Sequence, residues 1–139
     1  MEETLKLIET TFMSRPEELK HIRQVVRETV EKQGASKETI DCVVLAVNEA
    51  CMNIIQHAYK SAPDCKIILE ILLVGGEFVF RLIDFAEPVD KCKIKSRSLD
   101  ELRPGGLGVH MMHKVMDEVV FLEPCRGAGN ILELRKKIH

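Results

Sequence analysis

The chain has 139 residues, of which 45% are hydrophobic and 30% charged, with a formal net charge of -2. This length and mixture fit one folded domain over residues 1–139 and exclude a disordered chain, while the charge offers no general attraction to nucleic acid or anionic membranes. Because no apolar stretch could span a bilayer and the five cysteines form no Cys-x-x-Cys pair, we expect a cytoplasmic protein with reduced thiols.

The N-terminal residues predict a strand followed by a helix. Residues 4–11 mix β-branched and apolar residues in rough alternation, which is typical of a strand. Ser14 and Glu17 have the spacing of a capping box, and Pro16 is tolerated in a first helical turn. A first helix should therefore run to about Gln33.

The second predicted helix is the longest element. Gly34 separates it from the first helix, and Ser36 can cap its N-terminus. Its buried side is marked by an apolar series at helical spacing, namely Ile40, Val43, Val44, Val47, Cys51, Ile54, Ile55 and Ala58.

Glu49, Asn53 and His57 form a polar stripe within this helix. Their spacing of four places successive side chains on one face, roughly 6 Å apart. An acid and an amide on one wall could hold a base beside a metal ion, but the solvated side of any amphipathic helix shows the same pattern. Taken alone, the stripe does not decide between these interpretations, and we interpret His57 as a structural residue near the helix end.

The middle of the chain predicts an antiparallel hairpin followed by a long loop. Residues 66–74 and 77–84 are rich in Ile, Leu, Val and Phe, and Gly75-Gly76 between them allows a tight turn. Residues 85–103 lose this periodicity. A loop of that length in a compact domain is either mobile or functional.

A third helix and two closing strands complete the predicted elements. The helix opens at Gly105-Gly106-Leu107-Gly108 and continues with an apolar stripe that includes Met111 and Met112, and the strands cover residues 118–122 and 130–137. Consecutive strand pairs favour a mixed, mostly antiparallel sheet, and three amphipathic helices suffice to cover one of its faces. The predicted fold class is a two-layer α/β (α+β) sandwich.

Three separated segments carry chemistry when they are taken together. Asp84 lies where a buried strand leaves the core, so its carboxylate could accept a hydrogen bond from a ligand amine. The Gly105–Gly108 segment leaves backbone N–H groups uncovered at a helix N-terminus, which suits phosphate. Asn53 would supply an oxygen ligand for Mg²⁺ and Glu49 a base. Together these groups predict a nucleotide site.

In order and spacing, these segments resemble the stand-alone ATP-binding anti-sigma regulatory factors that act as serine/threonine protein kinases within the GHKL ATPase superfamily. The resembling segments are residues 47–59, 83–90, 103–109, 115–119 and 129–132. The resemblance implies a Bergerat-type sandwich that binds Mg-ATP. It also implies transfer of the γ-phosphoryl group to a serine or threonine of a small anti-anti-sigma (STAS-type) protein, binding of a sigma factor, and a homodimer.

The same resemblance implies roles for individual residues. Asn53 would be the Mg²⁺ ligand, Glu49 would polarise the attacking hydroxyl, and Asp84 would bind the adenine amino group. The other implied ATP-binding residues are Ala86, Arg103, Gly105, Gly106, Leu107, Gly108 and Asn130.

Ala86 departs from the Asp-x-Gly pattern of that family. Alanine adds a methyl group where backbone and base approach closely, and it disfavours positive φ. If the backbone has positive φ here, ATP binding is weakened or rearranged; if φ is negative, the substitution costs almost nothing.

Three functions therefore compete at the level of sequence. A protein kinase leads, because phosphoryl transfer depends mainly on positioning and charge neutralisation. A nucleotide-gated binding module without kinase activity is the alternative. A detached catalytic domain of a histidine-kinase-like protein is disfavoured, because no helix pair with an acceptor histidine precedes the domain.

Overall fold

The computed structural model describes residues 3–86, 111–122 and 129–138. Residues 111–115 are helical. The remaining elements, in chain order, are β1 (Thr4–Met13), the 3₁₀ helix η1 (Pro16–Glu18), α1 (Leu19–Glu31), α2 (Lys37–Asn53), the π-helical segment η2 (Ile54–Ala58), β2 (Lys66–Val74), β3 (Glu77–Asp84), β4 (Glu118–Leu122) and β5 (Asn130–Lys137).

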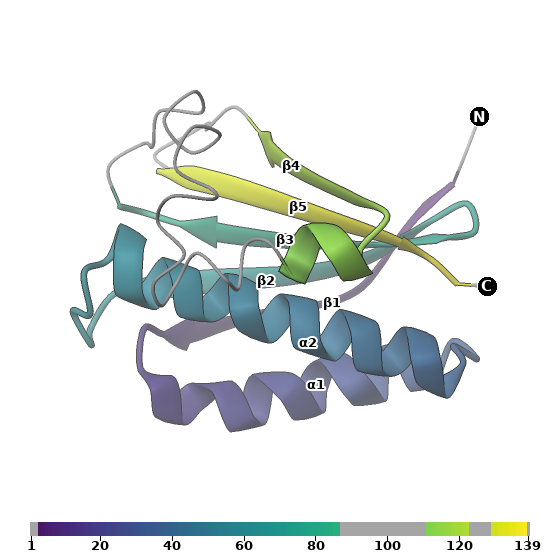
Figure 1. Ribbon diagram of the computed structural model, residues 1–139, viewed down its shortest axis with the longest axis horizontal. Helices are drawn as coiled ribbons and strands as arrows, with labels where there is room; N and C mark the ends of the chain where they lie inside the picture. The colour runs from purple at the N-terminus through teal and green to yellow at the C-terminus, as the bar shows by residue number, and fades with distance from the viewer. Residues whose placement is uncertain (1–2, 87–110, 123–128, 139) are drawn as a thin grey trace.

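The five strands form one sheet in the order β1-β2-β3-β5-β4, and all four neighbouring pairs are antiparallel. The helices lie on one face of this sheet, as Figure 1 shows. The predicted two-layer sandwich is confirmed, and its described strand pairs are all antiparallel. The bounds of the hairpin and of the two closing strands match the prediction, whereas β1 extends to Met13 because Phe12 pairs with Ile67 and is buried.

The predicted capping box at the first helix is wrong. Arg15 is the residue that precedes η1, and it makes no side-chain cap. The Ser14 hydroxyl instead donates to the carbonyl of Ala62 and accepts from the N–H of Cys65. The predicted cap of the second helix is confirmed, since the Ser36 hydroxyl accepts from the N–H of Thr39 at 3.2 Å.

The core lies between the helices and the inner face of the sheet. The apolar face predicted for the second helix is buried along α2 and into η2, except that Ala58 at the end of η2 is only partly buried. Of the methionines predicted for the third helix, Met112 within it and Met116 just after it are buried. Met111 is 41% exposed and does not belong to the core stripe as predicted.

The other face of the sheet carries a network of ion pairs. Glu133 is buried on this face, and its carboxylate accepts hydrogen bonds from Arg81 and Arg135, each at 2.8 Å. Burial raises the pKa of Glu133, but the two guanidinium groups outweigh it and hold the pKa below its ordinary value. The network extends through a 3.2 Å ion pair between Arg135 and Glu77.

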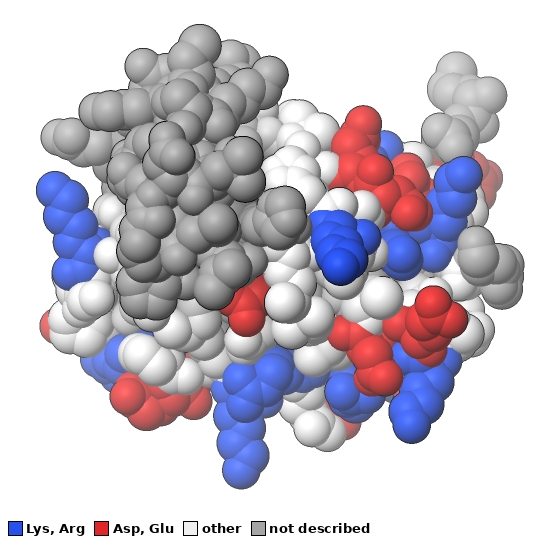
Figure 2. Space-filling view, viewed as in Figure 1, with Lys and Arg blue, Asp and Glu red and all other residues white. Residues whose placement is uncertain are grey.

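No helix within the described ranges is long and apolar enough to cross a membrane. Cys42, Cys51 and Cys65 are free thiols. Over the described part of the face in Figure 2, basic and acidic side chains are interspersed rather than gathered by sign.

Candidate functional site

Glu49 and Asn53 lie on consecutive turns near the C-terminal end of α2, which contacts β3 and β5. Both residues are half-buried, between the core side of the helix and solvent. Because α2 remains α-helical through Asn53, their spacing of four puts both side chains on one face, as predicted.

Of the three residues in the predicted stripe, Glu49 and Asn53 lie in α2, and His57 lies in the π-helical segment that follows. After Asn53 the helix widens into η2, where the N–H of Tyr59 donates to the carbonyl of Ile54, five residues earlier, at 2.9 Å. His57 is exposed, whereas Glu49 and Asn53 are half-buried.

The side-chain amide of Asn53 has an unusual environment. Its Nδ2 atom is buried and has no hydrogen-bond partner within the described parts of the chain. A buried donor without a partner costs about 1–3 kcal/mol, and such groups are rare in folded proteins. A ligand bound at this end of α2 could accept the hydrogen bond that Asn53 Nδ2 can donate.

Asp84 is the last residue of β3 and is 3% exposed. Its Oδ1 atom accepts hydrogen bonds from Asn130 Nδ2 at 2.9 Å and from the N–H of Ala86 at 3.1 Å. Burial raises the pKa of Asp84, and these two hydrogen bonds oppose the rise. Both bonds involve Oδ1, so Oδ2 has no partner among the described residues and can accept a hydrogen bond from a ligand.

Gly129 closes this end of the sheet against Asp84 and Ala86. Its N–H donates to the carbonyl of Asp84 at 2.8 Å. A Cβ atom at position 129 would lie 1.6 Å from the carbonyl oxygen of Ala86, so only glycine fits. The sequence placed Gly129 in the resembling segment 129–132 but did not predict a function for it, because no local pattern indicates this backbone contact.

The alanine at position 86 does not strain the backbone. Among the described residues other than glycine, only Lys60 and Ser61 have positive φ. Of the two alternatives left open by the sequence, the one without a conformational cost therefore applies to Ala86.

Tyr59 is a second residue whose contribution the sequence did not reveal. Its hydroxyl donates to the carbonyl of Lys66 and accepts from the N–H of Phe85, both at 2.6 Å. Burial raises the pKa of Tyr59, the N–H of Phe85 opposes this, and the charge of Asp84 adds to the rise. The phenol therefore keeps its proton at neutral pH.

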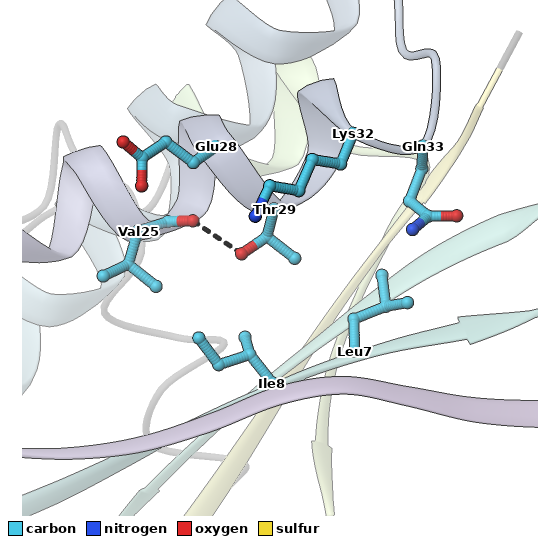
Figure 3. A pocket seen from close by; sticks show the side chains of 7 residues that line it. All are labelled: Leu7, Ile8, Val25, Glu28, Thr29, Lys32 and Gln33. Atoms are coloured by element: carbon cyan, nitrogen blue, oxygen red, sulfur yellow. Dashed lines mark hydrogen bonds between the residues drawn. The ribbon is translucent and has the colours of Figure 1, made fainter.

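The remaining predicted site residues, Arg103, Gly105, Gly106, Leu107 and Gly108, lie outside the described residues. A hollow of about 200 Å³ occurs elsewhere, between α1 and β1, where it is lined mainly by Leu7, Ile8, Val25 and Thr29 (Figure 3). Glu28, Lys32 and Gln33 line it as well, and the Thr29 hydroxyl donates to the carbonyl of Val25. None of the predicted site residues lines this hollow.

Residues 12–136 match the family model of the histidine kinase-like ATPase domain. The chain belongs to this family. Serine-protein kinase RsbW of Bacillus pumilus is 33% identical over 134 residues, which cover 86% of this chain and 80% of the relative. RsbW of Bacillus subtilis is 27% identical over 127 residues, covering 86% and 79% of the two chains.

Two solved structures are similar to this chain in fold. The RsbU and RsbW domains of a Mycobacterium tuberculosis protein give a TM-score of 0.66 at 17% identity, over 94% of this chain and 31% of the longer one. The SiaB–SiaC complex of Pseudomonas aeruginosa gives a TM-score of 0.61 at 16% identity, over 94% and 89%. These likenesses show the fold, whereas the match of residues 12–136 to the family model confirms the predicted superfamily. The predicted kinase class agrees with the names of the relatives.

Proposed function

We propose that this chain is an ATP-dependent serine/threonine protein kinase and anti-sigma regulatory factor. It transfers the γ-phosphoryl group of Mg-ATP to a STAS-type anti-anti-sigma protein, and it sequesters a sigma factor as a cytoplasmic homodimer. The arrangement at Asp84 carries the proposal: a buried carboxylate is fixed through Oδ1 and leaves Oδ2 for a ligand amine. The family and the names of its relatives support the same activity.

Recognition of the adenine would combine the Asp84 carboxylate with the backbone around it. Oδ2 accepts a hydrogen bond from the adenine 6-amino group, while Asn130 and Ala86 hold Oδ1. Burial favours this hydrogen bond, because competing water is excluded. The predicted phosphate-binding residues Arg103, Gly105, Gly106, Leu107 and Gly108 complete the proposed site.

The protein residues fit a magnesium ion that arrives with the nucleotide. The side-chain amide of Asn53 carries a hard carbonyl oxygen. Its nitrogen has no hydrogen-bond partner among the described residues, so the amide can turn toward a ligand without breaking a bond made by Nδ2. Within the described ranges no group of three or more His, Cys, Asp or Glu could hold a metal. Mg²⁺ commonly binds through one or two protein ligands plus substrate phosphates, and when bound it neutralises phosphate charge.

Glu49 is the proposed general base, one helical turn before Asn53. Its carboxylate takes the proton of the substrate hydroxyl as the oxygen–phosphorus bond forms and the bond from the γ-phosphorus to the β,γ-bridging oxygen breaks. Its half-buried position leaves the carboxylate accessible to an incoming side chain.

The test is phosphoryl transfer from Mg-[γ-³²P]ATP to a co-encoded STAS-type protein. We expect label on a serine or threonine of that protein with the wild-type chain. Glu49→Gln should bind ATP with nearly unchanged affinity and lose transfer. Label transfer at the wild-type rate by this variant would refute the assigned base, and ATP binding without any transfer by the wild type would favour the nucleotide-gated binding module.

A further inference from the structure

The hydroxyl of Tyr59 joins the two elements that carry the proposed site. Tyr59 directly follows η2, which continues the helix that bears Asn53. Its hydroxyl donates to the carbonyl of Lys66 at the start of β2 and accepts from the N–H of Phe85 just beyond β3, both at 2.6 Å. The last backbone pair of these strands is Ile67 with Asp84, so the phenol continues the sheet where the strand ladder ends.

The hydrogen bond to Phe85 affects the direction of the Asp84 carboxylate. The next N–H along the chain, that of Ala86, donates to Asp84 Oδ1. The carbonyl of Asp84 in turn accepts from Gly129. The backbone is thus fixed on both sides of Asp84, by Tyr59 after it and by β5 beside it. Without the phenol oxygen, the Phe85–Ala86 turn loses one of these constraints.

Tyr59 is itself held firmly. Lys60 and Ser61 follow it with φ of 51° and 65°, a conformation that non-glycine residues adopt only when their surroundings impose it. The N–H of Ser61 donates to the carbonyl of Ile55 at 2.7 Å, and the N–H of Ala62 donates to the carbonyl of Tyr59 at 2.9 Å. The Ser14 hydroxyl then ties Ala62 to the end of β1. The backbone that follows Tyr59 is therefore held against the end of η2 and against β1.

We infer that Tyr59 is a positioning residue that aligns Asp84 with the 6-amino group of the purine and thereby sets the preference for adenine nucleotides. The inference rests on the proposed function. It predicts a specific defect in adenine recognition, because the Tyr59 hydroxyl contacts the backbone at Lys66 and Phe85 and, among the described residues, makes no hydrogen bond with Glu49 or Asn53.

The experiment compares the dissociation constants of Mg-ATP and of Mg-purine riboside triphosphate, which lacks only the 6-amino group. Wild type should prefer ATP by about tenfold or more, as expected for a hydrogen bond to a carboxylate. Tyr59→Phe should lose most of this preference and bind the analogue as wild type does. In Tyr59→Phe/Asp84→Asn, ATP should bind no more weakly than in Asp84→Asn alone, because both changes act on one contact.

Thr29→Val is the matched control, since it also deletes a hydroxyl that donates to a backbone carbonyl, in α1. It should keep the full preference for ATP. An equal loss of affinity for both nucleotides in Tyr59→Phe would indicate a general structural role and overturn the inference, as would an unchanged preference. If wild type binds neither nucleotide, the proposed function itself is wrong. If wild type binds ATP but Tyr59→Phe gives either of the two results above, only the inference about Tyr59 is wrong.

A second measurement does not depend on the stability of the variant. Tyr59 is the only tyrosine of the chain, so biosynthetic 3-fluorotyrosine gives a single ¹⁹F resonance. We expect this resonance to shift on saturation with Mg-ATP and to shift clearly less with the analogue. Equal shifts with both nucleotides, or none with either, would contradict the inference.

Discussion

Replacement of Gly129 by alanine tests the backbone contact at the end of the candidate site. The added Cβ would lie 1.6 Å from the carbonyl oxygen of Ala86 and 2.7 Å from its carbonyl carbon, so the backbone has to move. Movement of this size lengthens the 2.8 Å hydrogen bond from Gly129 to Asp84. Overpacking costs about 1–3 kcal/mol and the lost hydrogen bond about 1 kcal/mol, so the free energy of unfolding should fall by roughly 2–4 kcal/mol.

For a domain of this size, such a loss lowers the thermal midpoint by roughly 6–15 °C. The assay is thermal unfolding followed by circular dichroism, together with calorimetric titration of Mg-ATP, whose affinity should also fall because Asp84 is displaced. Gly76→Ala is the control, since a Cβ there has nothing within 4 Å and the glycine lacks positive φ. Equal midpoints for Gly129→Ala and Gly76→Ala would refute the reasoning.

Three further predictions follow from single side chains. Asp84→Asn should weaken Mg-ATP binding about tenfold to a hundredfold, and wild-type affinity in calorimetry would mean that the amine acceptor lies elsewhere. Glu133→Gln should cost about 1–3 kcal/mol at pH 7. Because the folded-state pKa of Glu133 is lowered, the stabilisation by its carboxylate is present above the ordinary pKa of 4.5 and is lost as pH falls through the folded-state pKa. The unfolding free energies of wild type and Glu133→Gln, measured by urea denaturation, should therefore converge in acid. Burial raises the pKa of Cys51 to about 12, so iodoacetamide at pH 8 should modify Cys42 and Cys65 well before Cys51; early labelling of Cys51 would contradict its buried position.

Local patterns predicted most of the strands and the helix order. The Gly75-Gly76 pair and the alternating apolar residues around it gave the hairpin bounds, because turn chemistry and side-chain alternation act within a few residues. Ser14 shows where such reasoning fails. Its spacing from Glu17 has the form of a capping box, but hydrogen bonds to Ala62 and Cys65 determine its role, and those partners are far away in sequence.

The candidate site likewise has features that local sequence predicts and features that depend on contacts between distant segments. The position of Asp84 at a strand end followed from the apolar run before it. Its pairing with Asn130 depends on β5 lying beside β3, which is a matter of strand order and cannot be derived from local periodicity. Tyr59 and Gly129 were missed for the same reason, since their contacts join segments that are distant in the chain.

The π-helical turn after Asn53 is a further difference from the expected geometry. His57 lies in this wider turn and is exposed, whereas Asn53 before it is half-buried. Tyr59 directly follows the turn, and its hydroxyl contacts Lys66 and Phe85 at the strand ends.

Calorimetric titration of Mg-ATP into the wild-type chain shows whether the chain binds the nucleotide through Asp84. We expect saturable binding at one site per chain, with an affinity that drops in Asp84→Asn. Absence of binding heat at several temperatures, together with an unchanged thermal midpoint at millimolar Mg-ATP, would contradict it.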